Sequence, residues 1–136
     1  MDKAYAPLRG RGEQMRRKVL GDAFVDNSAK AAVNFGADFQ NVVTAFAWGG
    51  VWSREGLSLR DRSLVTVAVL TALHRPEELK LHIGAGLRNG LTKTELEEAM
   101  IQVAVYAGFP AAVAGNRVGQ AVFRELEGSG AEAEKT

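Results

Sequence analysis

The residues best suited to proton transfer in this chain are Glu78 and His82, four positions apart in the segment 76–90. This segment predicts a single helix, because proline suits the first turn of a helix and glycine suits the residue that ends one. Side chains four residues apart lie on one face of a helix, so we expect the carboxylate beside the imidazole. The next residues on that face, Ala85 and Gly86, are small and predict open space next to the imidazole.

Two interpretations of His82 remain open on this evidence. In the structural one, the imidazole lies at the edge of the core and is held by a hydrogen bond. In the functional one, the Glu78 carboxylate stabilises the imidazolium, raises the pKa of His82 and fixes its tautomer. These effects suit a general acid that works near neutral pH, so the pair is a candidate catalytic site.

Arg62 is a candidate for binding an anion. It follows Ser58 and Asp61, a polar cap and an acidic residue that predict the start of a helix. The helix dipole does not favour a cation at that end, which suggests another purpose for the guanidinium. Arg62 is therefore either a surface charge or a residue that points into a pocket and holds a carboxylate.

Three aromatic residues are candidates for the wall of a small-ligand pocket. Trp48 and Trp52 flank two glycines and, at a spacing of four, can stack on one helix face. Such a pair is either core packing or, where the glycines bend the chain, an aromatic wall. Tyr106 precedes a Gly-Phe-Pro break, and its hydroxyl needs a partner if it is buried.

Metal chemistry has no support in the sequence. His74 and His82 are eight residues apart across an expected helix break, and no third ligand stands at a suitable spacing. His74 has a structural explanation, because a cation is favourable near the C-terminal end of a helix. The chain has no cysteine, which excludes disulfides, thiol catalysis and iron–sulfur clusters.

Composition narrows the class of protein. The chain has 136 residues, 46% of them hydrophobic and 24% charged, with a net charge of +1, as expected for a globular domain. The near-neutral charge predicts no nucleic-acid partner.

The N-terminal segment is locally basic, and we interpret it as a solvated surface. Its basic residues are Arg9, Arg11, Arg16, Arg17 and Lys18. The sequence shows neither a secretory h-region nor a membrane-spanning apolar run, so we expect a cytoplasmic protein without a membrane partner.

Apolar residues at spacings of three and four predict helices along the chain, and no strand pattern competes with them. The expected helices are 13–20, 26–52 with a break at Asn34 or Gly36, 64–73, 76–90, 94–107 and from Pro110 onward. The Gly49-Gly50 pair is expected to end or kink the second of these helices. The run 64–73 is apolar nearly all round, which predicts a helix buried on every side.

These elements predict a single all-α domain over residues 1–136, a bundle of about six or seven helices. Residues 1–10 predict an N-terminal arm, and residues 128–136 predict a flexible tail. Thr92 and Glu95 have the spacing of a capping box and predict the start of the helix 94–107.

The order of these features resembles the carboxymuconolactone decarboxylase family, within the alkylhydroperoxidase-like superfamily. The resemblance covers about residues 12–127 and is carried by the segments 15–22, 37–40, 47–52, 60–64, 87–92 and 102–112. The His82 helix alone would indicate only the superfamily. The segments around Trp48–Trp52 and Tyr106–Ala112 indicate the decarboxylase branch.

The resemblance implies an all-α, alkylhydroperoxidase-like subunit in a ring-like homo-oligomer, commonly a hexamer arranged as a trimer of dimers. It implies no metal and no organic cofactor. Peroxidase relatives carry two cysteines where this chain has Arg75 and Glu78, so peroxidase chemistry is excluded. The implied substrate is a small dicarboxylate lactone, 4-carboxymuconolactone, which is decarboxylated in the protocatechuate branch of the β-ketoadipate pathway.

This resemblance also implies roles for the candidate residues. His82 is expected to donate the proton, Glu78 to orient it and Arg62 to anchor a carboxylate with help from Arg88. The expected substrate-binding wall consists of Trp48, Trp52 and Tyr106. Two alternatives remain open, namely a decarboxylase or isomerase of a different small lactone and a non-catalytic, ligand-binding helical oligomer.

Overall fold

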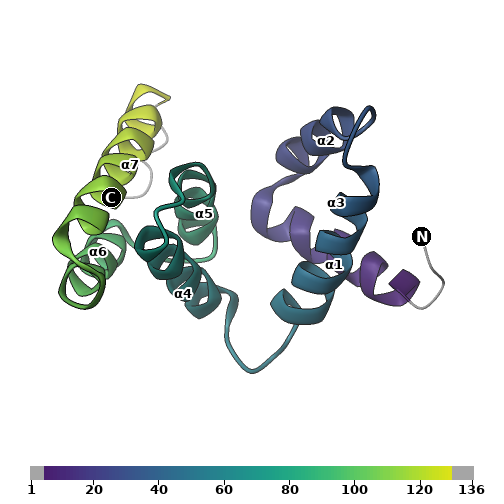
Figure 1. The fold of residues 1–136 in the computed structure, drawn as a ribbon, viewed down its shortest axis with the longest axis horizontal. Coiled ribbons are helices and arrows are strands. Elements are labelled where there is room, and N and C mark those ends of the chain that lie inside the picture. The colour runs from purple at the N-terminus through teal and green to yellow at the C-terminus, as the bar shows by residue number, and fades with distance from the viewer. Residues whose placement is uncertain (1–4, 130–136) are drawn as a thin grey trace. The chain divides into compact units, whose positions relative to one another are not determined.

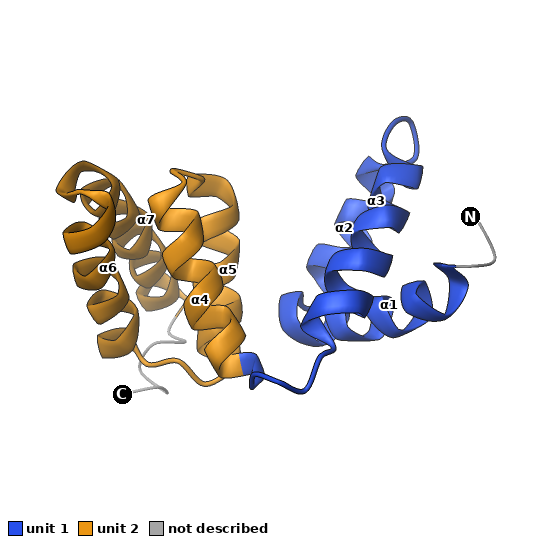
Figure 2. Ribbon diagram, turned by 60° about the horizontal axis from the view of Figure 1, so that its bottom comes forward, with its two compact units in different colours: residues 1–59 blue, residues 60–136 orange. Residues whose placement is uncertain are grey.

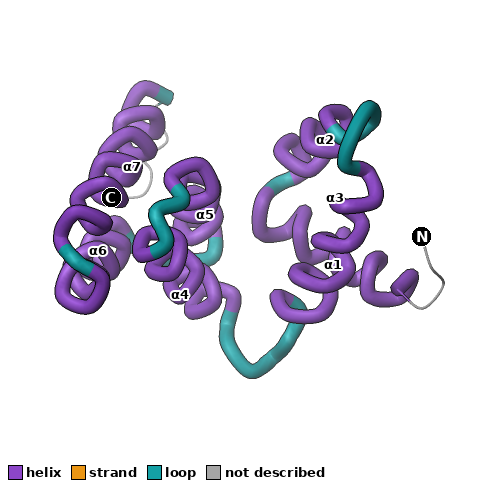
Figure 3. Tube along the Cα trace, in the orientation of Figure 1, coloured by secondary structure: helices purple, strands orange, loops and turns teal. Residues whose placement is uncertain are grey.

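The computed structural model describes residues 5–129, and every regular element in this range is helical (Figures 1 and 3). The elements are α1 Ala6–Leu20, α2 Asp22–Ala31, α3 Ala37–Val43, the π-helix η2 Thr44–Trp52, α4 Leu59–Ala72, α5 Pro76–Arg88, α6 Lys93–Ala107 and α7 Phe109–Gly128. Seven α-helices and one π-helix confirm the predicted all-α class for the described part of the chain.

The chain divides between Leu59 and Arg60 into two compact units, coloured separately in Figure 2. Unit 1 contains the helices from α1 to η2, and unit 2 contains nearly all of α4 and the helices that follow it. The single domain expected over residues 1–136 stays a prediction.

Two glycines bring α1 and η2 of unit 1 into direct backbone contact. A methyl group on Gly12 would overlap the carbonyl oxygen of Thr44 and lie 2.8 Å from the backbone nitrogen of Gly49. A methyl group on Gly49 would overlap the carbonyl oxygen of Leu8. The two helices therefore approach more closely than any residue with a side chain would allow at these positions.

The predicted helix 26–52 is interrupted over five residues, because α2 ends at Ala31 and α3 begins at Ala37. Gly36 closes this turn with a φ of 104°, a conformation that glycine adopts without steric cost. The break at Gly36 is thus confirmed. The Gly49-Gly50 pair lies inside η2, so the regular α-helix gives way to a π-helix before the glycines rather than at them.

Predictions for the two ends of the chain need correction. Residues 6–10, expected in an N-terminal arm, form the start of α1, where Pro7 occupies the first turn. Residue 128, expected in the flexible tail, is the last residue of α7. The rest of the predicted arm at 1–4 and of the predicted tail at 130–136 lies outside the described residues.

Unit 2 has its own hydrophobic core, formed by side chains from all four of its helices and the α5–α6 loop. Its buried members are Val67, Leu79, Ile83, Leu91, Leu96, Met100 and Val122. The predicted capping box is confirmed, since Thr92 Oγ1 accepts from the Glu95 backbone at 3.1 Å and Glu95 accepts from the Thr92 backbone at 2.9 Å. This cap fixes the start of α6 and the loop that follows α5.

The prediction that the run 64–73 is buried on every side is wrong for the described chain. Val67 and Thr71 are buried, whereas Val65, Val69 and Leu73 are exposed. The exposed residues are spaced by four and form one stripe, because α4 directs only its opposite face into the core. Both faces of α4 carry apolar residues, so the sequence pattern did not distinguish the buried face from the exposed one.

We expect the Gly12→Ala variant to unfold at a lower urea concentration than the wild type. The added methyl group forces α1 and η2 apart, and overpacking of this kind costs about 1–3 kcal/mol. Tryptophan fluorescence measures the effect, because both tryptophans of the chain lie in η2.

Gly10→Ala is the matched control for this prediction, since a methyl group at Gly10 meets nothing within 4 Å. A helix-interior alanine there should be neutral or stabilise by about 0.5–1 kcal/mol. Equal stability of the Gly12→Ala and Gly10→Ala variants would contradict the close α1–η2 contact.

Candidate active site

Glu78 and His82 lie on one face of α5, as the sequence predicts, but their environments differ. Glu78 is exposed, whereas His82 is half-buried and its Nδ1 atom is shielded from solvent. Burial lowers the pKa of His82, and the Glu78 carboxylate opposes this effect by raising it. The expected rise in pKa is therefore wrong in sign, because loss of hydration outweighs the attraction of an exposed carboxylate.

The space at Gly86, one turn after His82, is filled. A methyl group on Gly86 would lie 2.9 Å from Leu91 Cδ1 and 3.7 Å from Ser63 Cβ, and Ala85 is fully buried. The small residues after His82 therefore allow close packing of α4 and the α5–α6 loop against α5.

Arg62 lies where α4 packs on α5. The neighbouring residue, Ser63, is fully buried and accepts a hydrogen bond from Asn89 Nδ2 at 2.9 Å. Because Ser63 also faces Gly86, one turn after His82, the start of α4 lies beside the C-terminal half of α5. Arg62 is half-buried at this end of the helix pair and its Nε atom is shielded from solvent, as expected for a residue that points inward.

Arg88 lies on the same helix as His82. A methyl group on Gly84 would lie 3.8 Å from Arg88 Nη1, so the guanidinium folds back along α5 over Gly84. Burial lowers the pKa of Arg88. The predicted part of Arg88 in the site stays a prediction.

Trp48 and Trp52 belong to the core of unit 1. Their rings stack with centroids 4.9 Å apart and planes 20° apart. Only 5% of Trp48 and 9% of Trp52 is exposed, so packing accounts for most of their surface. Their predicted part in a ligand wall remains a prediction, and they lie in a different unit from His82.

Tyr106, on the last turn of α6, is 83% exposed. The sequence argument for this residue depended on a buried hydroxyl that would need a partner. That premise is wrong for the described chain, because the hydroxyl group is accessible to water. Its predicted contact with a substrate stays untested.

A cavity of about 370 Å³ in unit 2 contains none of the predicted site residues. Its lining includes Ile83, Lys93, Glu97, Phe123 and Arg124. This hollow offers charged and aromatic groups, but no lining side chain has an ordinary pKa near neutrality. His82, the candidate proton donor, does not line this cavity.

Arg16 is a candidate that the sequence analysis missed, since it was assigned to a solvated basic surface. Residues 12, 16, 19 and 20 of α1 are buried, and the arginine is only 7% exposed. The signal was available in the spacing, because these positions recur at helical intervals with two apolar residues among them. A charged side chain on an otherwise buried face points to function more often than one on a solvated face.

Two further classes of site were sought in residues 5–129. This range holds no group of three or more histidine, aspartate or glutamate residues arranged to bind a metal ion. In the same range, no helix combines the length and the apolar character needed to cross a membrane.

Comparison with known proteins gives consistent results. The profile of the carboxymuconolactone decarboxylase family matches residues 37–121. The chain is 46% identical over 115 residues to 4-carboxymuconolactone decarboxylase of Acinetobacter baylyi, which covers 85% of this chain and 86% of that protein. It is 33% identical over 129 residues to nitrosuccinic acid decarboxylase of Metarhizium robertsii, covering 95% of this chain and 90% of that protein.

We expect an NMR titration to give His82 a pKa below 6.5, because burial is the larger influence on this group. The unfolded chain then takes up a proton before the native one as the pH falls below about 6.5, so acidification lowers the free energy of unfolding. Glu78→Gln should lower the pKa of His82 further, since it removes the opposing carboxylate.

Glu77→Gln serves as the control, because this neighbouring carboxylate is absent from the causes of the shift. The His74→Asn variant assigns the signals of the two histidines. A pKa of His82 above 6.5, or equal effects of the two glutamine variants, would contradict this description of the site.

Proposed function

Because the chain belongs to the carboxymuconolactone decarboxylase family, we propose that it catalyses decarboxylation of 4-carboxymuconolactone to the β-ketoadipate enol-lactone. The observation that carries the proposal is the 46% identity, over most of both chains, to an enzyme with this name. A half-buried, titratable histidine that interacts electrostatically with a carboxylate on the same helix supports the proposal as a proton donor.

The proposed reaction needs no external electron acceptor. The bond from the ring carbon to the departing carboxylate breaks, and its electron pair moves through the ring double bond to the lactone carbonyl. Carbon dioxide leaves, and the resulting dienolate takes up one proton on carbon. The protein therefore has to hold two anionic groups, stabilise the dienolate oxygen and deliver that proton.

We assign the delivery of the proton to His82. A lowered pKa makes the imidazolium a stronger acid but reduces its population near neutral pH. Glu78 raises the pKa against the effect of burial, so it increases the fraction of His82 that carries a proton. We therefore assign two roles to Glu78, which are to increase the protonated fraction of His82 and to orient its ring.

We assign a substrate carboxylate to Arg62, whose guanidinium can bind carboxylate oxygens in a bidentate manner. Its half-buried position at the α4–α5 contact supports this role. The proposed contacts of the substrate with Arg88, Trp48, Trp52 and Tyr106 rest on the family resemblance.

The proposed assembly is a homo-oligomer, expected to be a hexamer built as a trimer of dimers. The exposed apolar stripe of α4 supports it, because such a surface is suited to burial against another chain. Exposed apolar residues on α6 and α7 extend the apolar surface of unit 2; they include Ile101, Val105, Phe109 and Val113. A cytoplasmic location remains the expectation from the sequence.

A second candidate function is decarboxylation of a different dicarboxylate. The 33% identity to an enzyme named for nitrosuccinic acid favours it. A nitro group on the carbon that loses carbon dioxide can accept the electron pair as a conjugated lactone does. Decarboxylation of either substrate would require the protein to bind anionic groups and to deliver one proton.

The two functions are separated by mixing the purified protein with 4-carboxymuconolactone or with nitrosuccinate and following the release of carbon dioxide. We expect the lactone to be the faster substrate, because the nearer of the two relatives is named for it. Faster release from nitrosuccinate would favour the second function. No release from either compound by a folded protein would contradict both.

Replacement of His82 by alanine should lower kcat for the lactone about 10²- to 10⁴-fold, the usual range for loss of a general acid. The rate of the wild type should fall as the pH rises above the lowered pKa of His82, because the donor must be protonated. His74→Asn is the matched control and should leave kcat unchanged. An unchanged kcat in the His82→Ala variant would remove His82 from the mechanism.

A further inference from the structure

Arg16 of α1 is a buried cation without an anionic partner in the described structure. It is 7% exposed, and among residues 5–129 its guanidinium forms neither a hydrogen bond nor an ion pair. Its carbon Cζ lies 5.9 Å from the centre of the Phe24 ring. Burial lowers the pKa of Arg16, while the Glu13 carboxylate acts in the opposite direction from beyond ion-pair distance. Burying a charge in this way opposes folding unless another group compensates it.

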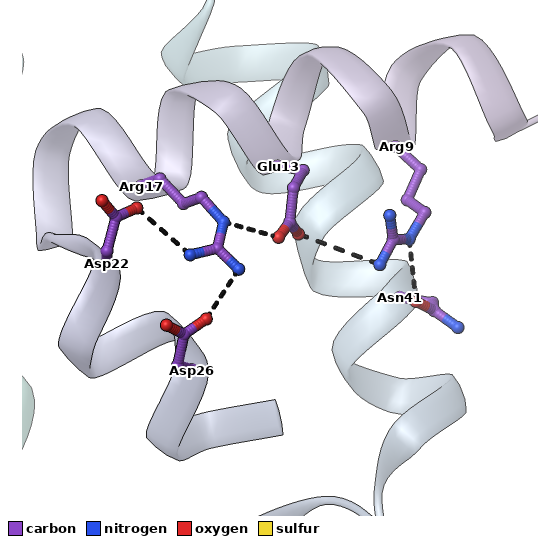
Figure 4. Close-up of polar contacts among 6 residues, drawn as sticks. All are labelled: Arg9, Glu13, Arg17, Asp22, Asp26 and Asn41. Carbon is purple, nitrogen blue, oxygen red and sulfur yellow. Dashed lines mark hydrogen bonds and ion pairs between the residues drawn. The ribbon is translucent and has the colours of Figure 1, made fainter. Parts of the chain in front are cut away.

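The adjacent residue, Arg17, has the opposite arrangement (Figure 4). Although it is more exposed, it pairs with Glu13 at 2.9 Å, Asp22 at 3.1 Å and Asp26 at 2.8 Å. Glu13 also lies 3.8 Å from Arg9. The carboxylates around this part of α1 thus form ion pairs with Arg9 and Arg17, and none of them forms an ion pair with Arg16. A sequence selected for stability alone would pair the buried charge first.

The position of Arg16 connects it with η2. Arg16 follows Gly12 by four residues, so both lie on one face of α1. Gly12 is the residue at which α1 touches the backbone of η2. The guanidinium lies over the Phe24 ring of α2 and starts from the face of α1 that contacts η2, in the unit whose π-helix carries Trp48 and Trp52. Short π-helical segments are frequent at functional sites.

We propose that Arg16 binds a carboxylate of the substrate. A guanidinium matches a carboxylate in shape and charge, and the small exposed fraction of Arg16 restricts its partner to a group of that size. The identity of the anion rests on the proposed decarboxylation, whereas the need for an anion rests on Arg16 itself.

A purely structural role makes the opposite prediction for stability. If Arg16 mainly supported the packing of unit 1, its replacement would lower the melting temperature. If it is a buried charge kept for a ligand, Arg16→Met should leave the melting temperature unchanged or raise it, because methionine fills the space without a charge. The melting temperature therefore separates the two roles before any ligand is added.

The experiment compares the wild type with the Arg16→Met and Arg11→Met variants in a buffer without carboxylates. We expect Arg16→Met to raise KM for 4-carboxymuconolactone about 10- to 100-fold, as for loss of a hydrogen-bonded charge. Binding of glutarate, a dicarboxylate that cannot react, should weaken by a similar factor when followed by tryptophan fluorescence. Arg11 is exposed on the same helix, so Arg11→Met should change neither value.

Each outcome decides the proposal. Unchanged KM and glutarate affinity in a folded Arg16→Met protein would overturn it. Failure of both Arg16→Met and Arg16→Gln to fold would also overturn it, because the arginine would then be structural. A wild type that binds glutarate through Arg16 but releases no carbon dioxide from the lactone would retain the anion site and reject the decarboxylation.

Discussion

Burial of His82 within unit 2 sets the electrostatics of the proposed proton donor. Ser63, buried at the start of α4, accepts a hydrogen bond from Asn89 and faces Gly86, one turn beyond His82. Leu91 closes the same region from the α5–α6 loop. These contacts belong to unit 2, the unit in which burial lowers the pKa of His82. The acidity of the proposed proton donor thus follows from burial, and Glu78 moderates it.

Desolvation governs the candidate residues of unit 1 as well. Arg17 lies at the surface of α1 and is compensated by three carboxylates, whereas Arg16 is buried and receives none. The close approach of α1 to η2 at Gly12 is the reason that this face excludes water. In both units, therefore, burial lowers the pKa of a candidate residue, Arg16 in unit 1 and His82 in unit 2. Buried positions combine a fixed geometry with a low local polarity, which strengthens the interaction of a charge with a ligand.

The proposed reaction requires little beyond charged and titratable groups held in surroundings of low polarity. A conjugated lactone accepts the electron pair released with carbon dioxide, so the protein contributes anion binding, a dry surrounding and one proton. In the proposed mechanism, Arg62 on α4 supplies an anion contact and His82 on α5 supplies the proton. The chain is similar to two decarboxylases that are named for different substrates. This agrees with a site that needs only groups to bind an anion and to donate a proton.

Local sequence determined the helices, the capping box before α6 and the placement of Glu78 and His82 on one face of α5, because these depend on residues within a few positions of each other. It also carried the family resemblance. Only the tertiary structure decided which side chains are buried. It placed Arg16 inside and Tyr106 outside, and it filled the space beside Gly86. Burial depends on residues that are distant along the chain, and so does the sign of the pKa shift of His82, which no local pattern could supply.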